Sequence, residues 1–108
     1  MRPGTAWLIL IAAGLFEVVW AVGLRSTEGF TRGGPTLVVL IAMAVSVYGL
    51  SLSMRVLPVG TAYAVWTGIG TLGAVIIGIL VLGEPRTAAR LVCIALIVSG
   101  IVGLRVFS

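Results

Sequence analysis

The sequence contains no histidine, aspartate, asparagine, glutamine or lysine, and it has a single cysteine, Cys93. Its only acidic side chains are Glu17, Glu28 and Glu84. One chain therefore cannot assemble an acid, base and nucleophile constellation or a cluster of metal ligands. No glycine-rich phosphate loop follows a strand either. We expect no enzyme, no metal and no cofactor, and a lone cysteine excludes an intramolecular disulfide.

Charge is also scarce. Only 9% of the 108 residues are charged and 60% are hydrophobic, whereas a soluble domain has about 25% charged residues. A soluble chain of this length has too little interior to hide so much apolar surface. The seven arginines give a formal net charge of +4, but they are spread over the chain and form no cluster that would bind nucleic acid. Membrane lipid is the expected surrounding.

Four apolar segments cover about residues 4–24, 35–54, 58–83 and 87–106. Each is close to the ~20 residues that a bilayer-spanning helix needs. Short loops rich in turn-forming residues separate them, so we expect an all-α integral membrane protein with one four-helix domain over residues 1–108. The first segment could instead be a signal peptide, but a glutamate within it and its length argue against cleavage.

The arginines show almost no bias between the two sides of the membrane. Four spans place both termini on one side. That side carries Arg2, Arg55 and Arg105, and the opposite side carries Arg25, Arg32, Arg86 and Arg90. Orientation follows an excess of basic residues in the cytoplasmic loops, and three against four gives almost none. A chain that inserts both ways can pair with its inverted copy, so we expect an antiparallel, dual-topology homodimer.

Small residues recur every four positions in the fourth segment, at Ala95, Ser99 and Gly103. Such a pattern allows two helices to approach closely in a membrane. We expect it to form the dimer contact, with packing within the chain as the alternative.

Glu17 lies about a dozen residues into the first segment, or roughly 18 Å along a helix, which is well inside a ~30 Å hydrocarbon core. Ionisable residues at this depth usually mark ion or proton pathways. Arg25 is about 12 Å away along the same helix, so Glu17 has no obvious counter-ion. We expect the carboxyl group to hold a proton until a cation arrives; a structural glutamate hydrogen-bonded between helices is the alternative.

Several residues could line a cation site around Glu17. Gly14 and Trp20 share its helix face, and the tryptophan offers an indole N–H and a π face. Ser46 lies near the middle of a small, partly polar stripe in the second segment. Each of these residues could instead serve only to pack one helix against another.

The third segment adds two aromatic residues, Tyr63 and Trp66, one helical turn apart, followed by Gly68 and Gly70. The aromatic residues could line the site or lie at the membrane interface. The glycines could pack closely against a neighbour or let the helix flex, because glycine weakens a helix.

Together these stretches resemble the small multidrug resistance family over essentially the whole chain. The resemblance rests on STEGFTR at 26–32, LPVGTAYAVWTGIG at 57–70, and the SGIVGL end of the fourth segment. GLFEVVWAVGLR and AVWTGIGTLGAV look like the guanidinium-exporting subtype of that family. One departure is Arg25, where a lysine is common; the charge is the same.

The resemblance implies a proton-coupled antiporter in the bacterial cytoplasmic membrane that works as an antiparallel homodimer. Glu17 would bind protons and guanidinium alternately, and Trp20, Ser46, Tyr63 and Trp66 would shape the site. The chemistry agrees, because guanidinium is planar and its forked donors match a carboxylate. Two rivals stay open: a broad-specificity exporter of quaternary ammonium or aromatic cations, and a non-transporting, chaperone-like membrane subunit.

The arginine distribution generates the first testable prediction. Reporter fusions at the carboxyl end should show both orientations in the membrane, and two or three lysines added to one set of loops should bias insertion to one side. A single fixed orientation of the unmodified chain would contradict the antiparallel homodimer.

Overall fold

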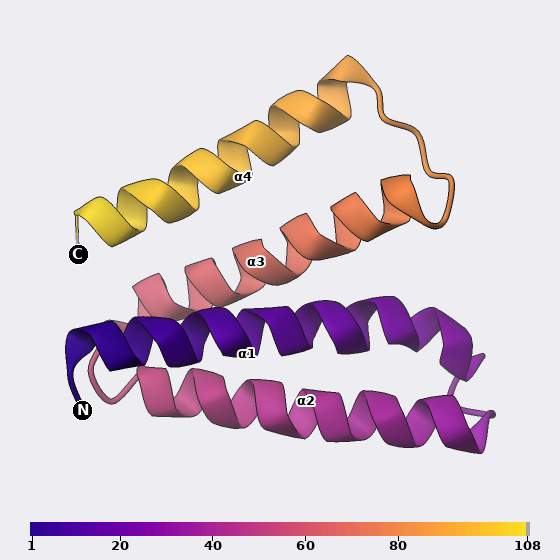
Figure 1. The fold of residues 1–108 in the computed structure, drawn as a ribbon, viewed down its shortest axis with the longest axis horizontal. Coiled ribbons are helices and arrows are strands. Elements are labelled where there is room, and N and C mark those ends of the chain that lie inside the picture. The colour runs from indigo at the N-terminus through magenta and orange to yellow at the C-terminus, as the bar shows by residue number, and fades with distance from the viewer. Residues whose placement is uncertain (108) are drawn as a thin grey trace.

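The computed structural model describes residues 1–107 and consists of helices joined by short loops (Figure 1). The elements are α1 (Pro3–Gly23), the 3₁₀ helix η1 (Leu24–Thr27), α2 (Gly33–Ser53), α3 (Val59–Leu80) and α4 (Ala88–Val106). All four α-helices are long and apolar enough to cross a membrane. The all-α, four-span class is thus confirmed. Ser108, the last residue of the expected domain, lies outside the described residues.

Two helix ends differ from the expected segments. Helix α2 begins at Gly33, before Pro35, because the first turn of a helix tolerates a proline that lacks a backbone N–H. Helix α3 ends at Leu80, short of Gly83. Gly83 has a φ of +71°, and the Glu84 N–H donates to the Gly78 carbonyl at 3.0 Å. The chain therefore turns back onto the end of α3.

The loop after η1 is organised by the buried residue Thr27. Its hydroxyl donates to the Leu24 carbonyl at 2.7 Å and accepts from the Phe30 N–H at 3.2 Å. These bonds hold Glu28, Gly29 and Phe30 at φ values of +48°, +72° and +66°, a region that residues with side chains rarely adopt. The STEGFTR stretch is thus a tight, well-bonded link between α1 and α2.

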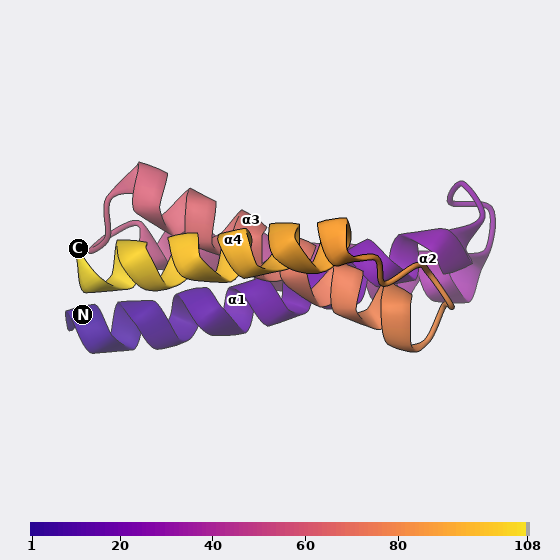
Figure 2. The same ribbon diagram turned by 90° about the horizontal axis from the view of Figure 1, so that it is seen from above.

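Helix α1 lies between α2 and α3, and α4 packs mainly on α3 (Figure 1). Seen from above, the helices form a thin slab (Figure 2), with extents of 39 × 35 × 16 Å. Both termini lie at one end of this slab (Figure 1). The loops after α1 and after α3 both lie at the other end (Figure 1), as four spans require.

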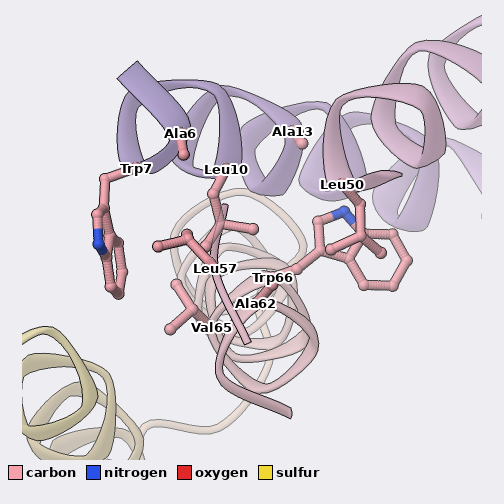
Figure 3. Packing of buried hydrophobic residues seen from close by; sticks show 9 residues of the cluster. All are labelled: Ala6, Trp7, Leu10, Ala13, Leu50, Leu57, Ala62, Val65 and Trp66. Carbon is pink, nitrogen blue, oxygen red and sulfur yellow. The ribbon is translucent and has the colours of Figure 1, made fainter. Parts of the chain in front are cut away.

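The largest apolar cluster fills the region where α1, α2 and α3 meet (Figure 3). Its buried members are Ala6, Trp7, Leu10, Ala13, Leu50, Leu57, Ala62, Val65 and Trp66. Helix α4, which is described along its whole length, has no buried residue. Its last turn reaches α1 through Arg105, whose guanidinium carbon lies 5.2 Å from the centre of the Trp7 ring. The three-helix part is therefore the stable frame, and α4 is an outer layer.

Small residues set the spacing between the framework helices. A Cβ atom at Gly14 would lie 2.7 Å from Ile69 of α3, and one at Gly73 would overlap Val18 of α1. Apolar burial drives little helix association in lipid, so close packing at such positions supplies much of the attraction. At Gly14 and Gly73 the backbone of one helix hence packs directly against a side chain of the other.

Gly73 provides a test of this contact. Gly73→Ala should destabilise the protein by about 1 to 3 kcal/mol, because the branched Val18 side chain cannot move aside without disturbing α1. Thermal unfolding in detergent would measure the loss. Gly60→Ala in the same helix is the control, because no other part of residues 1–107 lies within 4 Å of its Cβ position. Equal unfolding temperatures for the two variants would contradict the close contact.

Candidate functional site

Glu17 is buried on the side of α1 that faces α3, with 8% of its surface exposed. Its carboxyl group lies over Gly70, where any Cβ atom would overlap it. No hydrogen-bond partner for Oε1 exists among residues 1–107. A glycine at position 70 is therefore what admits the carboxyl group between the helices.

The carboxyl group faces a cavity of about 390 Å³ between α1 and the second half of α3. The cavity is lined by Glu17, Trp20, Ala21, Thr67, Gly70, Thr71, Ala74, Val75 and Glu84. Its floor on α3 follows positions three and four apart, which share one helix face. The space suits a small polar cation beside Glu17. Thr67 and Thr71 lie on the α3 wall that this cavity shares with a neighbouring cavity between α3 and α4.

Trp20 lines the same cavity, one helical turn after Glu17. Its indole N–H is buried and finds no partner in the described part of the chain. An unpaired buried polar group costs about 1 to 3 kcal/mol, and two residues of the cavity wall carry one: Glu17 an acceptor and Trp20 a donor. Such a site gains free energy when a ligand satisfies these groups.

Ser46 and Trp66 are brought together, but away from this cavity. The Trp66 indole donates to the Ser46 hydroxyl at 2.9 Å, and that hydroxyl donates to the Ala13 carbonyl at 2.7 Å. Ser46 is completely buried. The chain of bonds joins α3, α2 and α1 at a point one turn before Glu17, so these residues fix the position of the helix that carries the carboxylate.

The other expected site residues are spread over the neighbouring contacts. Gly14 packs against Ile69. Tyr63 lies beside Trp66, with ring centres 5.7 Å apart, and Tyr63 and Gly68 line a second, apolar cavity of about 760 Å³ between α3 and α4. Helix α3 runs without a break through Gly68 and Gly70, so flexing at these glycines stays a prediction.

The residues expected from the sequence do not include three polar residues of the cavity, Thr67, Thr71 and Glu84, or the apolar residues Ala74 and Val75. The threonines share a helix face with Gly70 and Ala74, and this spacing was the signal that could have identified them. Glu84 lies between the third and fourth expected segments, and only the turn at Gly83 brings it back to the cavity.

The family model described as Small Multidrug Resistance protein matches residues 5–97. A guanidinium exporter of Citrobacter freundii is 59% identical over 100 residues, which are 93% of this chain and 95% of the relative. Proteins of the same name from Salmonella typhi and Yersinia pseudotuberculosis are 57% and 52% identical, covering 93% and 95% of this chain and 95% and 99% of the relatives.

The chain belongs to the small multidrug resistance family, and the resemblance drawn from the sequence is confirmed. With four apolar helices it is a multi-pass membrane protein.

The Ser46 bridge generates a prediction on stability. Ser46→Ala leaves the Trp66 indole N–H without its acceptor, so it should lower the free energy of unfolding by about 1 to 3 kcal/mol. Ser53→Ala is the matched control, because Ser53 is also a fully buried serine of α2 but donates to Leu50 of its own helix. Denaturant unfolding in detergent should show the larger loss at Ser46; equal losses would contradict the bridging role.

Proposed function

We propose that the protein is a proton-coupled antiporter that exports guanidinium across the bacterial cytoplasmic membrane. The observation that carries this proposal concerns Glu17: its Oε1 is buried without a hydrogen-bond partner among residues 1–107, and the residue lines a cavity together with Trp20 and two threonines. The names of the relatives, which are guanidinium exporters, support the same substrate.

Exchange follows from the chemistry of one carboxyl group in a low-dielectric surrounding. A bare carboxylate is costly to bury, so Glu17 is stable with a proton or with a cation. Guanidinium offers parallel N–H donors that match both oxygens of a carboxylate. Proton and guanidinium therefore compete for one group, and the arrival of either releases the other.

The site is framed by residues that do not touch the cavity. In this proposal Ser46 and Trp66 hold the Ala13 end of the turn that precedes Glu17. Tyr63 supports Trp66, and Gly14 sets the distance to α3. Their contribution is to keep the carboxylate oriented toward the cavity.

An antiparallel homodimer is part of the proposal. A slab 16 Å thick leaves most of its surface uncovered, and α4 has Ala95 and Ser99 exposed and Gly103 half-buried. A second, inverted copy packed on α4 would shelter these small residues. It would also bring a second Glu17, and the two carboxyl groups would then titrate as a coupled pair.

The size and lining of the two cavities favour guanidinium over a bulky drug. The larger cavity, between α3 and α4, is apolar and could hold a large cation, but its lining contains no carboxylate. The cavity that does contain Glu17 is about half that size. A carboxylate that can balance the charge of a bound cation is therefore found in the smaller cavity, where only a small cation fits.

The test is proton-coupled uptake into liposomes that contain only this protein. Guanidinium should drive proton exchange, whereas tetramethylammonium, which lacks N–H donors, should be at least about tenfold poorer, since each unpaired polar group costs about 1 to 3 kcal/mol. Glu17→Gln should abolish the exchange while the protein stays folded, because it keeps the shape but cannot titrate. Glu17→Asp should keep part of the activity.

Three results would contradict this proposal. Equal or better transport of quaternary ammonium would support the broad-specificity exporter. Unchanged exchange in Glu17→Gln would contradict the role given to Glu17. No transport by the unmodified protein would support the non-transporting membrane subunit.

A further inference from the structure

We propose that Glu84 is an outer binding station for the guanidinium cation, at the end of the Glu17 cavity. Arg90 pairs with the Glu84 carboxylate when no cation is bound there. This inference rests on the proposed function and extends it from the site to the path that leads there.

The side chain of Glu84 forms part of the cavity wall, although its backbone belongs to the loop after α3. Its backbone N–H donates to the Gly78 carbonyl at 3.0 Å. Its carboxyl group folds back over Gly78 so closely that a Cβ atom at this position would overlap it. Glu84 lines the same cavity as Glu17.

The two carboxyl groups are seated in the same way. Glu17 lies over Gly70 and Glu84 lies over Gly78, and Ala74 lines the cavity between them. These three α3 positions are four residues apart and share a face, and the two glycines are about 12 Å apart along the axis. Oε1 of the inner carboxyl group is buried and has no hydrogen-bond partner among residues 1–107, while the outer glutamate side chain is 44% exposed. A cation can therefore pass from water to Glu84 and then to Glu17 along one face of α3.

Arg90 shows what chemical group Glu84 accepts. Its Nη2 atom lies 3.1 Å from Glu84 Oε1, with 32% of its side chain exposed. The head of an arginine side chain is itself a guanidinium group. An ion pair this exposed contributes little to stability, so a free guanidinium ion can replace Arg90 at the carboxylate.

The loops at this end of the protein carry net positive charge, which opposes the approach of a cation. The loops after α1 and after α3 lie at the same end (Figure 1) and carry four arginines, Arg25, Arg32, Arg86 and Arg90, against two glutamates, Glu28 and Glu84. A cation approaching this end meets net positive charge. A carboxylate at the cavity mouth offsets that repulsion locally and raises the concentration of the cation there.

The experiment measures initial rates of guanidinium-driven proton exchange in liposomes for three variants of the full chain. Glu84→Gln should raise KM by roughly three- to tenfold at low ionic strength, with the maximal rate within about twofold, because capture is weakened and Glu17 is intact. The increase should shrink in concentrated potassium chloride, since salt screens exposed charges.

Two further variants separate this role from a structural one. Arg90→Ala breaks the same ion pair but frees the carboxylate, so KM should fall or stay unchanged. Glu28→Gln removes the same charge from the same end but lies outside the cavity lining, so KM should rise less than in Glu84→Gln. Should Glu84→Gln fail to fold, Glu84→Asp, which keeps the carboxylate, should retain the salt-dependent KM of the unmodified protein.

The outcomes distinguish the two proposals. Equal losses of transport in Glu84→Gln and Arg90→Ala would show that the ion pair only stabilises the fold, and would contradict a binding role for Glu84. So would an unchanged KM in Glu84→Gln, an equal rise in Glu28→Gln, or a KM in Glu84→Asp that does not depend on salt. No guanidinium transport by the unmodified protein would instead overturn the proposed function.

Discussion

The rest of the structure depends on one requirement, that a carboxyl group in the middle of a membrane helix must be sheltered by protein. Lipid supplies neither a hydrogen bond nor a counter-ion, so Glu17 has to face another helix. Helix α3 meets this requirement because Gly70 leaves room for the carboxyl group and Gly73 lets the backbones approach. On the other side of α1, the Cβ of Ala13 lies only 3.0 Å from the position that a Cβ at Gly49 of α2 would take. The position of α1 between its neighbours thus follows from the residue it carries.

Much of this arrangement could be predicted from the sequence. Apolar length gave the four spans, and the isolation of Glu17 within the first span identified it as the candidate residue. Spacing showed which residues share a face of their own helix, such as Gly14 and Trp20. It could not show which helix lies opposite, because helix rotation is decided by packing. Ser46 was accordingly expected in the site, whereas its hydroxyl lies between Trp66 and the Ala13 carbonyl.

Glu84 illustrates a different limit. Its neighbours Gly83 and Pro85 are turn-forming residues, and a loop is the correct assignment for the backbone. The direction of the side chain depends on the left-handed conformation of Gly83 and on the small surface of Gly78. Neither is visible in hydropathy or in charge counts. A residue outside every helix can therefore belong to the wall of a cavity within the membrane domain.

The outer position of α4 also affects how the stability of this protein is defined. A helix with no buried residue of its own gains little from folding within one chain, so its order depends on what it meets in the bilayer. If that contact is another copy, mass action applies in two dimensions, and dilution by lipid favours separated chains. Unfolding temperatures would then depend on the protein-to-lipid ratio. Comparisons between variants are therefore meaningful only at a fixed surface density.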